Sequence, residues 1–553
     1  MLFGVTPSTA TKGIKMSANA GGKLKRDAGV IGLLFASLGG IIGSGWLLGP
    51  LNAAKIAGPA AVIAWLIGGV AILLLSFVYA ELATAFPRAG AVIAFPKLSH
   101  GNLMATVLSF VVFLGYASVA PAEASAVITY ASNYIGGLVD KSGTLTLIGF
   151  FASAGLLAAF AVVNILAIKI VLAINSTLTW WKLAIPVLTI LVFLLFGFHG
   201  HNFTVHSFAP SGVSGVFSAV ATSGIVFSYL GFRQAVELAG ESSNPRRNLP
   251  IAIIGSVTIG LTLYVGLQVA FIGALNPADI AKGWTNLTFK GAFGPFAGLA
   301  SLIGMGWLAV LLYIDAFASP SGTGIIYFTT TSRVLYATGQ EGLVGGPAFS
   351  KLSVAGVPIV GVVVAFLIGL LFLVPFPSWQ SIVTFISSAT VLSYGTGPVV
   401  LMTLRKTVPV DQYRRPYHLG GANIVGSLAF IISNFIIFWS GAVIDTFLFE
   451  LILGFTALYI AYEAFLGIGI TNLHWRGAWW LAPYFFGLWL VTYLGPKALT
   501  GGTGLLNQLE ASITLIGFSV AILLIAMNAG IPDPEEAKAT ILAGEPQLFS
   551  APE

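Results

Sequence analysis

Cysteine is absent from this sequence, and charged residues are scarce. None of the 553 residues is cysteine, which excludes disulfide bonds and thiolate metal sites. Aspartate, glutamate, lysine and arginine make up only 8% of the chain, whereas a soluble protein carries about 25%. Apolar residues make up 57%. Because so little charge cannot cover a surface that faces water, the composition predicts an all-α polytopic protein of the lipid bilayer.

Motifs of several other protein classes are also missing. The phosphate-binding pattern G-x-x-x-x-G-K-[ST] does not occur, which argues against ATP-driven machinery. No histidine or cysteine falls in the predicted membrane spans to form a nucleophile–base pair or a metal cluster, so no enzyme, metal or cofactor is predicted. The sequence shows no repeated ring of filter residues, which disfavours a channel. The net charge of +6 needs no nucleic acid, because basic cytoplasmic loops account for it.

Apolar runs of about twenty residues, the length that crosses a bilayer, predict the transmembrane helices. We expect about fourteen helices, in a range of roughly twelve to fourteen, at positions 28–53, 59–85, 103–134, 144–168, 171–198, 215–240, 250–274, 297–335, 357–375, 380–403, 423–444, 448–470, 477–495 and 509–529. Most of the 25 lysine and arginine residues lie on one side when the N-terminus is placed inside. This asymmetry predicts a protein of the cell (inner) membrane with two cytoplasmic tails, residues 1–27 and 530–553.

Two predicted helices carry glycine-rich interruptions. The first is "ASLGGIIGSGWLLGP" at positions 36–50, in predicted helix 1, and the second is "SGIVFSYLGFRQAVELAGE" at positions 223–241, in predicted helix 6. In helix 6 we expect the break at Tyr229, Leu230 and Gly231. Broken backbone at membrane depth is tolerated only where it lines a cavity or is buried in protein. The alternative is that the glycines only let helices pack closely.

The positions of the two interruptions favour a binding site. Five helices per half, an odd number, insert the second half upside down relative to the first. Matching broken helices in two such halves mark the binding site of a transporter. The N-terminal ends of the inner half-helices attract an anion, and freed carbonyl groups attract a cation. Together these groups suit a zwitterion, and an amino acid is the obvious candidate.

Four stretches carry a resemblance to a known family: "GGIIGSGWLLGP", "YAELATAFPRAGAVIAFP", "GFRQAVELAGESSNPRRNLPIAI" and "TSRVLYATGQEG". Over residues 28–420 the chain resembles the amino acid–polyamine–organocation (APC) superfamily, and it looks similar to bacterial permeases assigned to aspartate–proton symport. The resemblance implies a LeuT-type fold: a ten-helix core in a 5+5 inverted repeat with discontinuous helices 1 and 6. Residues 421–529 are then expected to form accessory transmembrane helices.

The resemblance also implies where a substrate binds. Its carboxylate is expected on the backbone at one end of the helix 1 break, and its ammonium group is expected against carbonyl groups of helix 6. The implied binding residues are Ile42, Gly43, Ser44 and Gly45 in helix 1, and Ser228, Tyr229, Leu230 and Gly231 in helix 6.

Charged side chains at membrane depth are functional candidates by default. Lys182 lies in "STLTWWKLAIP" on predicted helix 5. The resemblance to proton-coupled relatives implies that this lysine lies against helices 1 and 8 and exchanges a proton during transport. The alternative is a lysine that snorkels from a helix end. Glu123 on helix 3 and Asp315 on helix 8 are expected either to carry a proton or to form a structural salt bridge.

Arg233 lies two residues beyond the expected break in helix 6, where relatives usually carry an acidic residue. Because arginine binds carboxylates through two parallel hydrogen bonds, it favours an acidic substrate such as aspartate or glutamate. The alternative is an internal ion pair with Glu123, Asp315 or Glu237.

The sequence thus predicts a secondary active transporter that takes up amino acids by alternating access. Proton coupling is favoured, although the hydroxyl groups of Ser319, Ser321 and Thr323 keep sodium coupling as a second choice. A neutral amino acid transporter, an exchanger and a transporter-like nutrient sensor stay open as alternatives. The expected partners are an amino acid and the lipid bilayer, and the oligomeric state is left open.

Overall fold

The structure is a computed structural model that describes residues 27–88, 90–166, 168–344, 346–353, 356–408, 415–465 and 473–531. Within these residues the regular structure is helical, apart from two isolated bridges that pair Ala28 with Ser242 and Val139 with Leu145. This confirms the predicted all-α class. The predicted tails at residues 1–27 and 530–553 lie almost entirely outside the described residues.

The first half of the core contains five predicted spans, two of which are made of two helical pieces each. Its elements are α1 (Val30–Ile41), α2 (Gly45–Ala57), η1 (Gly58–Ala60), α3 (Ala61–Ala85), α4 (Ala91–His100), α5 (Asn102–Ala117), α6 (Val119–Ala131), α7 (Leu147–Leu166) and α8 (Ile168–Phe196).

The second half contains the other five predicted core spans and more short helices between them. Its elements are η2 (Gly200–Phe203), α9 (Gly212–Thr222), α10 (Ile225–Tyr229), η3 (Leu230–Phe232), α11 (Arg233–Glu237), η4 (Ala239–Glu241), α12 (Pro245–Ala274), α13 (Pro277–Ile280), η5 (Trp284–Asn286), α14 (Pro295–Leu302), α15 (Gly306–Gln340), α16 (Gly346–Phe349), α17 (Ile359–Phe372) and α18 (Trp379–Thr407).

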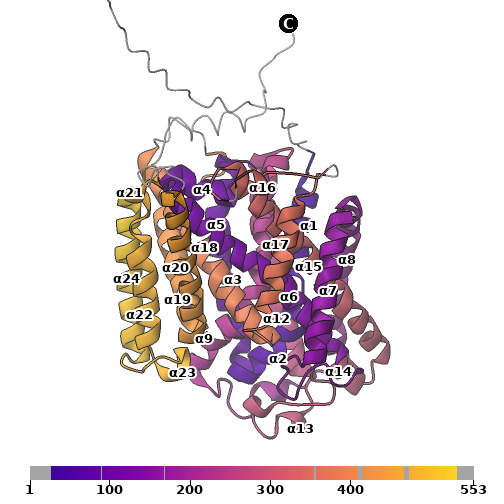
Figure 1. Cartoon of the computed structure of the whole chain (residues 1–553). Coiled ribbons are helices and arrows are strands. Elements are labelled where there is room, and N and C mark those ends of the chain that lie inside the picture. The colour runs from indigo at the N-terminus through magenta and orange to yellow at the C-terminus, as the bar shows by residue number, and fades with distance from the viewer. Residues whose placement is uncertain are drawn as a thin grey trace, which may run out of the picture.

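The accessory region follows the core in sequence and lies along one side of it in Figure 1, where orange and yellow helices stand at the left. Its elements are α19 (Ala422–Ser440), α20 (Ala442–Phe465), α21 (Trp475–Ala478), α22 (Leu481–Leu494), α23 (Lys497–Thr500) and α24 (Gln508–Ala529). Helix α19 joins this group to the core, because it packs against both α18 and α3.

In the part of the chain that the structure describes, fewer helices than the predicted fourteen have the length and hydropathy of a membrane span. Among the described residues, ten helices are long and apolar enough to cross a membrane, or eleven if the bent pair Gly212–Thr222 and Ile225–Glu237 counts as one span. All fourteen predicted segments contain helix, but α17 and α22 have 14 residues each and α1 has only 12. These helices are shorter than the roughly 20 residues that cross a bilayer on their own. The chain is a multi-pass membrane protein, and fourteen spans stays a prediction.

Helices at matching positions of the two halves contact each other, as an inverted repeat predicts. Helix α3 packs against α12, α6 against α15 and α7 against α17, and the broken first helix contacts η3 and α11 of the sixth. A hydrogen bond reinforces the contact between the two broken helices: Ser37 Oγ donates to the carbonyl oxygen of Phe232 at 3.1 Å. The two broken helices therefore lie together in the centre of the bundle.

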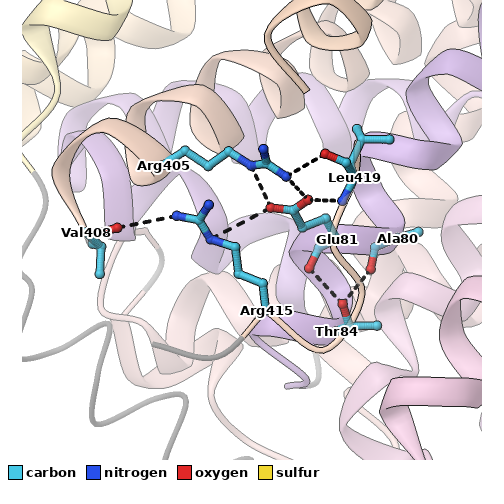
Figure 2. A network of polar contacts seen from close by, with 7 residues as sticks. All are labelled: Ala80, Glu81, Thr84, Arg405, Val408, Arg415 and Leu419. Carbon is cyan, nitrogen blue, oxygen red and sulfur yellow. Dashed lines mark hydrogen bonds and ion pairs between the residues drawn. The ribbon is translucent and has the colours of Figure 1, made fainter. Parts of the chain in front are cut away.

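A buried carboxylate ties the two halves together near the end of α3 (Figure 2). Glu81 is 1% exposed and accepts hydrogen bonds from Arg405 Nε of α18 at 2.8 Å and from the Leu419 N–H at 2.7 Å. A second nitrogen of Arg405 also binds Glu81, and Arg415 Nε lies 3.9 Å from the same carboxylate. Because the charge of Glu81 is matched by arginine, this network holds α3 against α18 and the segment that follows it.

Candidate functional site

The predicted break in helix 1 is confirmed. Helix α1 ends at Ile41 and α2 begins at Gly45, so three residues between them, Ile42, Gly43 and Ser44, lie outside the helix. A Cβ atom on Gly43 would lie 2.9 Å from Thr323 Oγ1 and would also overlap the Glu123 carboxylate. Any larger residue at the centre of the break therefore requires Glu123 or Thr323 to move.

The predicted position of the break in helix 6 is wrong. The chain leaves the helix at Ser223 and Gly224, and the two helical pieces around this point are bent by 48°. Gly224 has a φ of +94°, a conformation that favours glycine. Leu230 and Gly231 instead belong to a continuous 3₁₀ turn between α10 and α11.

Gly231 has a different structural role from the predicted one. A Cβ atom on Gly231 would overlap the backbone of Gly40 and Ile41 in α1, so glycine is needed here for close contact between the two broken helices. Nearby, the Tyr229 side chain is fully buried, and its hydroxyl group donates to the Trp65 carbonyl oxygen at 3.1 Å. For Gly231, the alternative interpretation of close packing therefore holds. The break in helix 6 lies about two helical turns before Gly231, at Gly224.

The chain's own carboxylate occupies the expected seat of the substrate carboxylate. Glu123 comes from α6, is fully buried, and accepts the Ser44 N–H through Oε2 at 2.8 Å. Its second oxygen, Oε1, has no hydrogen-bond partner among the described residues. Ser44 precedes the first turn of α2, where unpaired N–H groups and the helix dipole favour an anion. The Ser44 side chain is fixed in turn by Trp379, whose Nε1 donates to Ser44 Oγ at 2.8 Å.

Lys182 lies where the resemblance predicts it, between helices 1 and 8. It is fully buried, and its Nζ donates to the Gly39 carbonyl oxygen at 2.9 Å and to Thr323 Oγ1 at 2.7 Å. Thr323 Oγ1 also lies 3.2 Å from the carbonyl oxygen of Ile42. The ammonium group therefore binds one carbonyl group in the last turn of α1, next to the break, and the alternative of a lysine that snorkels to the surface does not hold.

Asp315 lies about two helical turns before Thr323 on α15. It is fully buried in α15, and Trp181 Nε1 donates to its Oδ1 at 2.8 Å, while Oδ2 has no hydrogen-bond partner among the described residues. Neither Asp315 nor Glu123 lies within 4.0 Å of a basic side chain in the part of the chain that the structure describes. The structural salt bridge that was the alternative for both is therefore not formed here.

Arg233 is not at the helix 1 break. Its side chain is 1% exposed, its Nη1 donates to Ser393 Oγ at 2.8 Å, and its guanidinium carbon lies 4.3 Å from the ring centre of Tyr394. The rings of Tyr79 and Tyr116 lie 5.2 and 5.8 Å away. Among the described residues no carboxylate comes within 4.0 Å, so the predicted alternative of an internal ion pair is not formed either.

The helix breaks are closed to solvent on both sides. Ile42, Ser44 and Tyr229 are fully buried, and Leu230 is 2% exposed. On one side the ring of Trp46 packs on Phe296 of α14 at 5.2 Å between centroids. On the other side the Ala28 N–H donates to the Glu241 carbonyl oxygen, and the Ser243 N–H donates to the Ala28 carbonyl oxygen, both at 3.0 Å. The structure is therefore an occluded conformation.

Sequence reasoning missed the side chains that complete this site. Trp379 and Ser393 come from α18 and meet helices 1 and 6 only in the folded chain. The three tyrosines around Arg233 come from α3, α5 and α18. Each of these residues lies far from its partner in the sequence, so no local motif links the two. The polar run "TFISSATVLSYGTG" in a predicted membrane span is nevertheless a signal that was available.

The chain is similar to known transport proteins over nearly its whole length. A family model described as "Amino acid permease" matches residues 29–458. The glutamate/serine transporter AimA of Bacillus subtilis (strain 168) is 37% identical over 96% of this chain and 100% of its own length. The aspartate-proton symporter of the same organism is 34% identical over 92% of this chain and 98% of its own length. The branched-chain amino acid permease BcaP, also from this organism, is 28% identical over 60% of the chain and 71% of its own length.

Proposed function

Because the chain belongs to the amino acid permease family, we propose that it is a proton-coupled symporter that takes acidic amino acids into the cell. Its relatives include a protein named for glutamate and serine and a protein named for aspartate and protons. One observation carries the proposal: Glu123, a buried carboxylate, is bound by the Ser44 N–H at the start of α2. A site that binds a carboxylate of the chain also suits the carboxylate of a substrate.

Substrate binding displaces Glu123 in this proposal. The Ser44 N–H donates to one carboxylate oxygen at a time, so the α-carboxylate of the substrate competes with Glu123 for the start of α2. Once displaced, the Glu123 carboxylate loses its hydrogen bond while it stays in the protein interior. An unpaired buried carboxylate is neutralised at least cost by binding a proton. Binding of substrate and uptake of a proton are then linked.

Lys182 connects this step to a conformational change. Its ammonium group links the Gly39 carbonyl of helix 1 to Thr323 of α15. When the ammonium group gives up its proton, it loses a donor and its charge, and the link between the two helices weakens. A sodium ion is disfavoured here, because the ammonium group already lies between the same carbonyl and hydroxyl oxygens and repels a cation.

The acidic substrate is supported by Arg233. This arginine is buried without a carboxylate partner within 4.0 Å among the described residues, so it attracts a substrate of net negative charge more strongly than a neutral amino acid. The orientation, with both termini in the cytoplasm of a cell membrane, is part of the proposal and is supported by the distribution of lysine and arginine.

Uptake into proteoliposomes tests the proposal. We expect a pH gradient, acidic outside, to drive accumulation of radiolabelled aspartate, and a sodium gradient alone not to do so. Lys182→Ala should abolish accumulation while some binding persists, whereas Lys141→Ala, an exposed lysine of the loop before α7, serves as the matched control. Full accumulation by Lys182→Ala would show that Lys182 is not the coupling group. Better competition by alanine or leucine than by aspartate would contradict the acidic substrate.

A further inference from the structure

We propose that Arg233, Tyr79, Tyr116, Tyr394 and Ser393 form a second carboxylate site, here called the arginine box, which binds the acidic substrate after it leaves the helix breaks. The inference rests on the proposed function for the identity of its ligand, a small acidic amino acid. Residues of α3, α5, α11 and α18 build the box, so it lies among four helices of the core.

Arg233 is a buried cation without an ion-pair partner in direct contact among the described residues. The Arg233 side chain is 1% exposed, and no carboxylate lies within 4.0 Å of it among the described residues. The aromatic rings stabilise the cation only in part, because their faces carry a partial negative charge and no formal one. Glu237, one turn further along α11, lies near enough to Arg233 and Tyr116 to interact with them electrostatically, but it lies more than 4.0 Å from the guanidinium nitrogens and its Oε1 has no hydrogen-bond partner in the same part of the chain. A buried cation in these surroundings calls for an anion.

The arginine box contains several buried hydrogen-bond donors that lack acceptors among the described residues. Arg233 Nε and Nη2 are buried and have no acceptor among the described residues. The Tyr116 hydroxyl group and Thr390 Oγ1 are buried without partners as well. Thr390 lies against Gly115, the residue before Tyr116, since a Cβ atom on Gly115 would come within 2.6 Å of Thr390 Oγ1. Several donors without acceptors around one guanidinium group match the acceptor oxygens of a carboxylate.

The arginine box and the helix 1 break contact different turns of α5 and α6. Tyr116 precedes Glu123 by seven residues along α5 and α6, which corresponds to about two helical turns or roughly 10 Å. This separation exceeds the reach of one aspartate molecule, so the helix 1 break and the arginine box bind the substrate in turn and not together.

A small cavity continues from the arginine box. Its volume is about 10 Å³, room for about one water molecule, and Tyr79 and Ser393 of the box line it. Thr396 of α18 and residues of α4 also line it. Tyr79 stands two residues before Glu81, at the end of α3 where α4 begins. The box therefore lies between the helix breaks and the end of the molecule that is predicted to face the cytoplasm, on the route by which an imported substrate leaves.

Cysteine labelling tests the arginine box without background, because the chain contains no cysteine. Thr396→Cys places a thiol in the cavity beside the box, and Ser228→Cys places one beside Gly45 at the helix 1 break. Each variant, reconstituted into proteoliposomes, is labelled with a membrane-permeant thiol reagent with and without aspartate. We expect aspartate to slow labelling at both positions by about tenfold at saturation.

Arg233→Gln, added to each cysteine variant, separates the two sites. We expect it to remove the protection of Thr396→Cys and to leave the protection of Ser228→Cys in place. Protection at Ser228→Cys alone, in the presence of Arg233, would overturn the second site and leave the proposed function standing. Absence of protection at both positions, together with absence of aspartate uptake, would overturn the proposed function itself.

Glu237→Gln is the matched control that tests whether Arg233 has only a structural role. If Arg233 serves only to pair with Glu237, then Glu237→Gln mimics Arg233→Gln, and this result would overturn the proposal. If Arg233 binds the substrate, we expect Glu237→Gln to keep the protection of Thr396→Cys or to increase it. Arg233→Lys keeps the charge but loses the planar fork, so we expect it to restore part of the protection that Arg233→Gln removes, even if Arg233→Gln folds poorly.

Discussion

At the scale of single residues, each charged side chain near the helix 1 break is held by a different partner. Glu123 accepts a backbone N–H, Lys182 donates to a carbonyl and a hydroxyl oxygen, and Asp315 accepts an indole N–H. None of these four bonds joins two of the charged groups directly. Each charged side chain can therefore bind or release a proton, or change its hydrogen-bond partner, while the other two keep their own bonds. The proposed stepwise coupling requires this independence.

Gly43→Ala tests the space around the Glu123 carboxylate. The added methyl group meets Thr323 Oγ1 at 2.9 Å and overlaps the carboxylate, so one of the three must move. We expect aspartate uptake to fall by about tenfold or more, which corresponds to a change of roughly 1.4 kcal/mol. Gly155→Ala in α7 is the control, because nothing lies within 4 Å of the position of its Cβ. Equal uptake by the two variants would contradict a tightly filled break.

At the scale of secondary-structure elements, polar joints at one end of the bundle hold helices together. Besides the Glu81 network, Glu341 at the end of α15 pairs with Lys97 of α4 and with Arg88, both at 2.8 Å. In addition, His100 at the end of α4 bonds to the Ala526 carbonyl oxygen of α24 at 3.0 Å. These joints connect α4 and its neighbours to the core and to the accessory helices.

Removal of the buried charge of Glu81 is expected to destabilise the fold. Glu81→Gln leaves Arg405, whose side chain is only 15% exposed, without its counter-charge. Breaking one side of a buried ion pair costs roughly 3–5 kcal/mol. Thermal unfolding of the purified protein in detergent measures the loss, and Glu341→Gln, at a more exposed pair, should lower the midpoint less. A larger fall of the unfolding midpoint for Glu341→Gln than for Glu81→Gln would contradict this expectation.

The joint between α4 and α24 is expected to depend on pH. Burial lowers the pKa of His100 to about 4 from an ordinary value of 6.5. The folded protein therefore keeps His100 neutral at a pH where the unfolded chain already binds a proton. The contribution of this residue to stability is complete above pH 6.5 and is lost as the pH falls toward 4, by up to about 3 kcal/mol.

His100→Gln removes this titrating group and keeps a side chain that can hydrogen-bond. We expect the variant to lose less stability than the wild type between pH 6.5 and pH 4. Melting temperatures measured across this range check the expectation, and identical slopes for the two proteins would contradict it.

At the scale of the whole molecule, the contacts across the two halves define an occluded transporter core, and a buried bond attaches the accessory helices to it. Ser388 Oγ of α18 donates to Asp445 Oδ1 of α20 at 2.8 Å, and Asp445 is fully buried. The helix breaks lie at the centre of this assembly, where neither side is open. Transport therefore requires the contacts at one end to open while those at the other end stay closed.

Several of these features could be predicted from the sequence, and others could not. The helix 1 break was predictable because glycines and Ser44 interrupt an apolar run that has no other reason to be interrupted. The break in helix 6 was misplaced, because Gly224 and Gly231 look alike in sequence and differ only in backbone conformation and in the helix that they contact. The bond between Trp379 and Ser44 spans 335 residues, and no local pattern records such a pairing.

The most direct test measures protons while aspartate binds to the purified protein in weakly buffered solution. If the substrate carboxylate takes the place of Glu123 on the Ser44 N–H, the wild-type protein should take up about one proton for each aspartate that binds. Glu123→Gln keeps an oxygen that accepts the same N–H but carries no charge, so it should bind aspartate without taking up a proton. Equal proton uptake by the two proteins, or aspartate binding to the wild type with no proton uptake, would contradict the account.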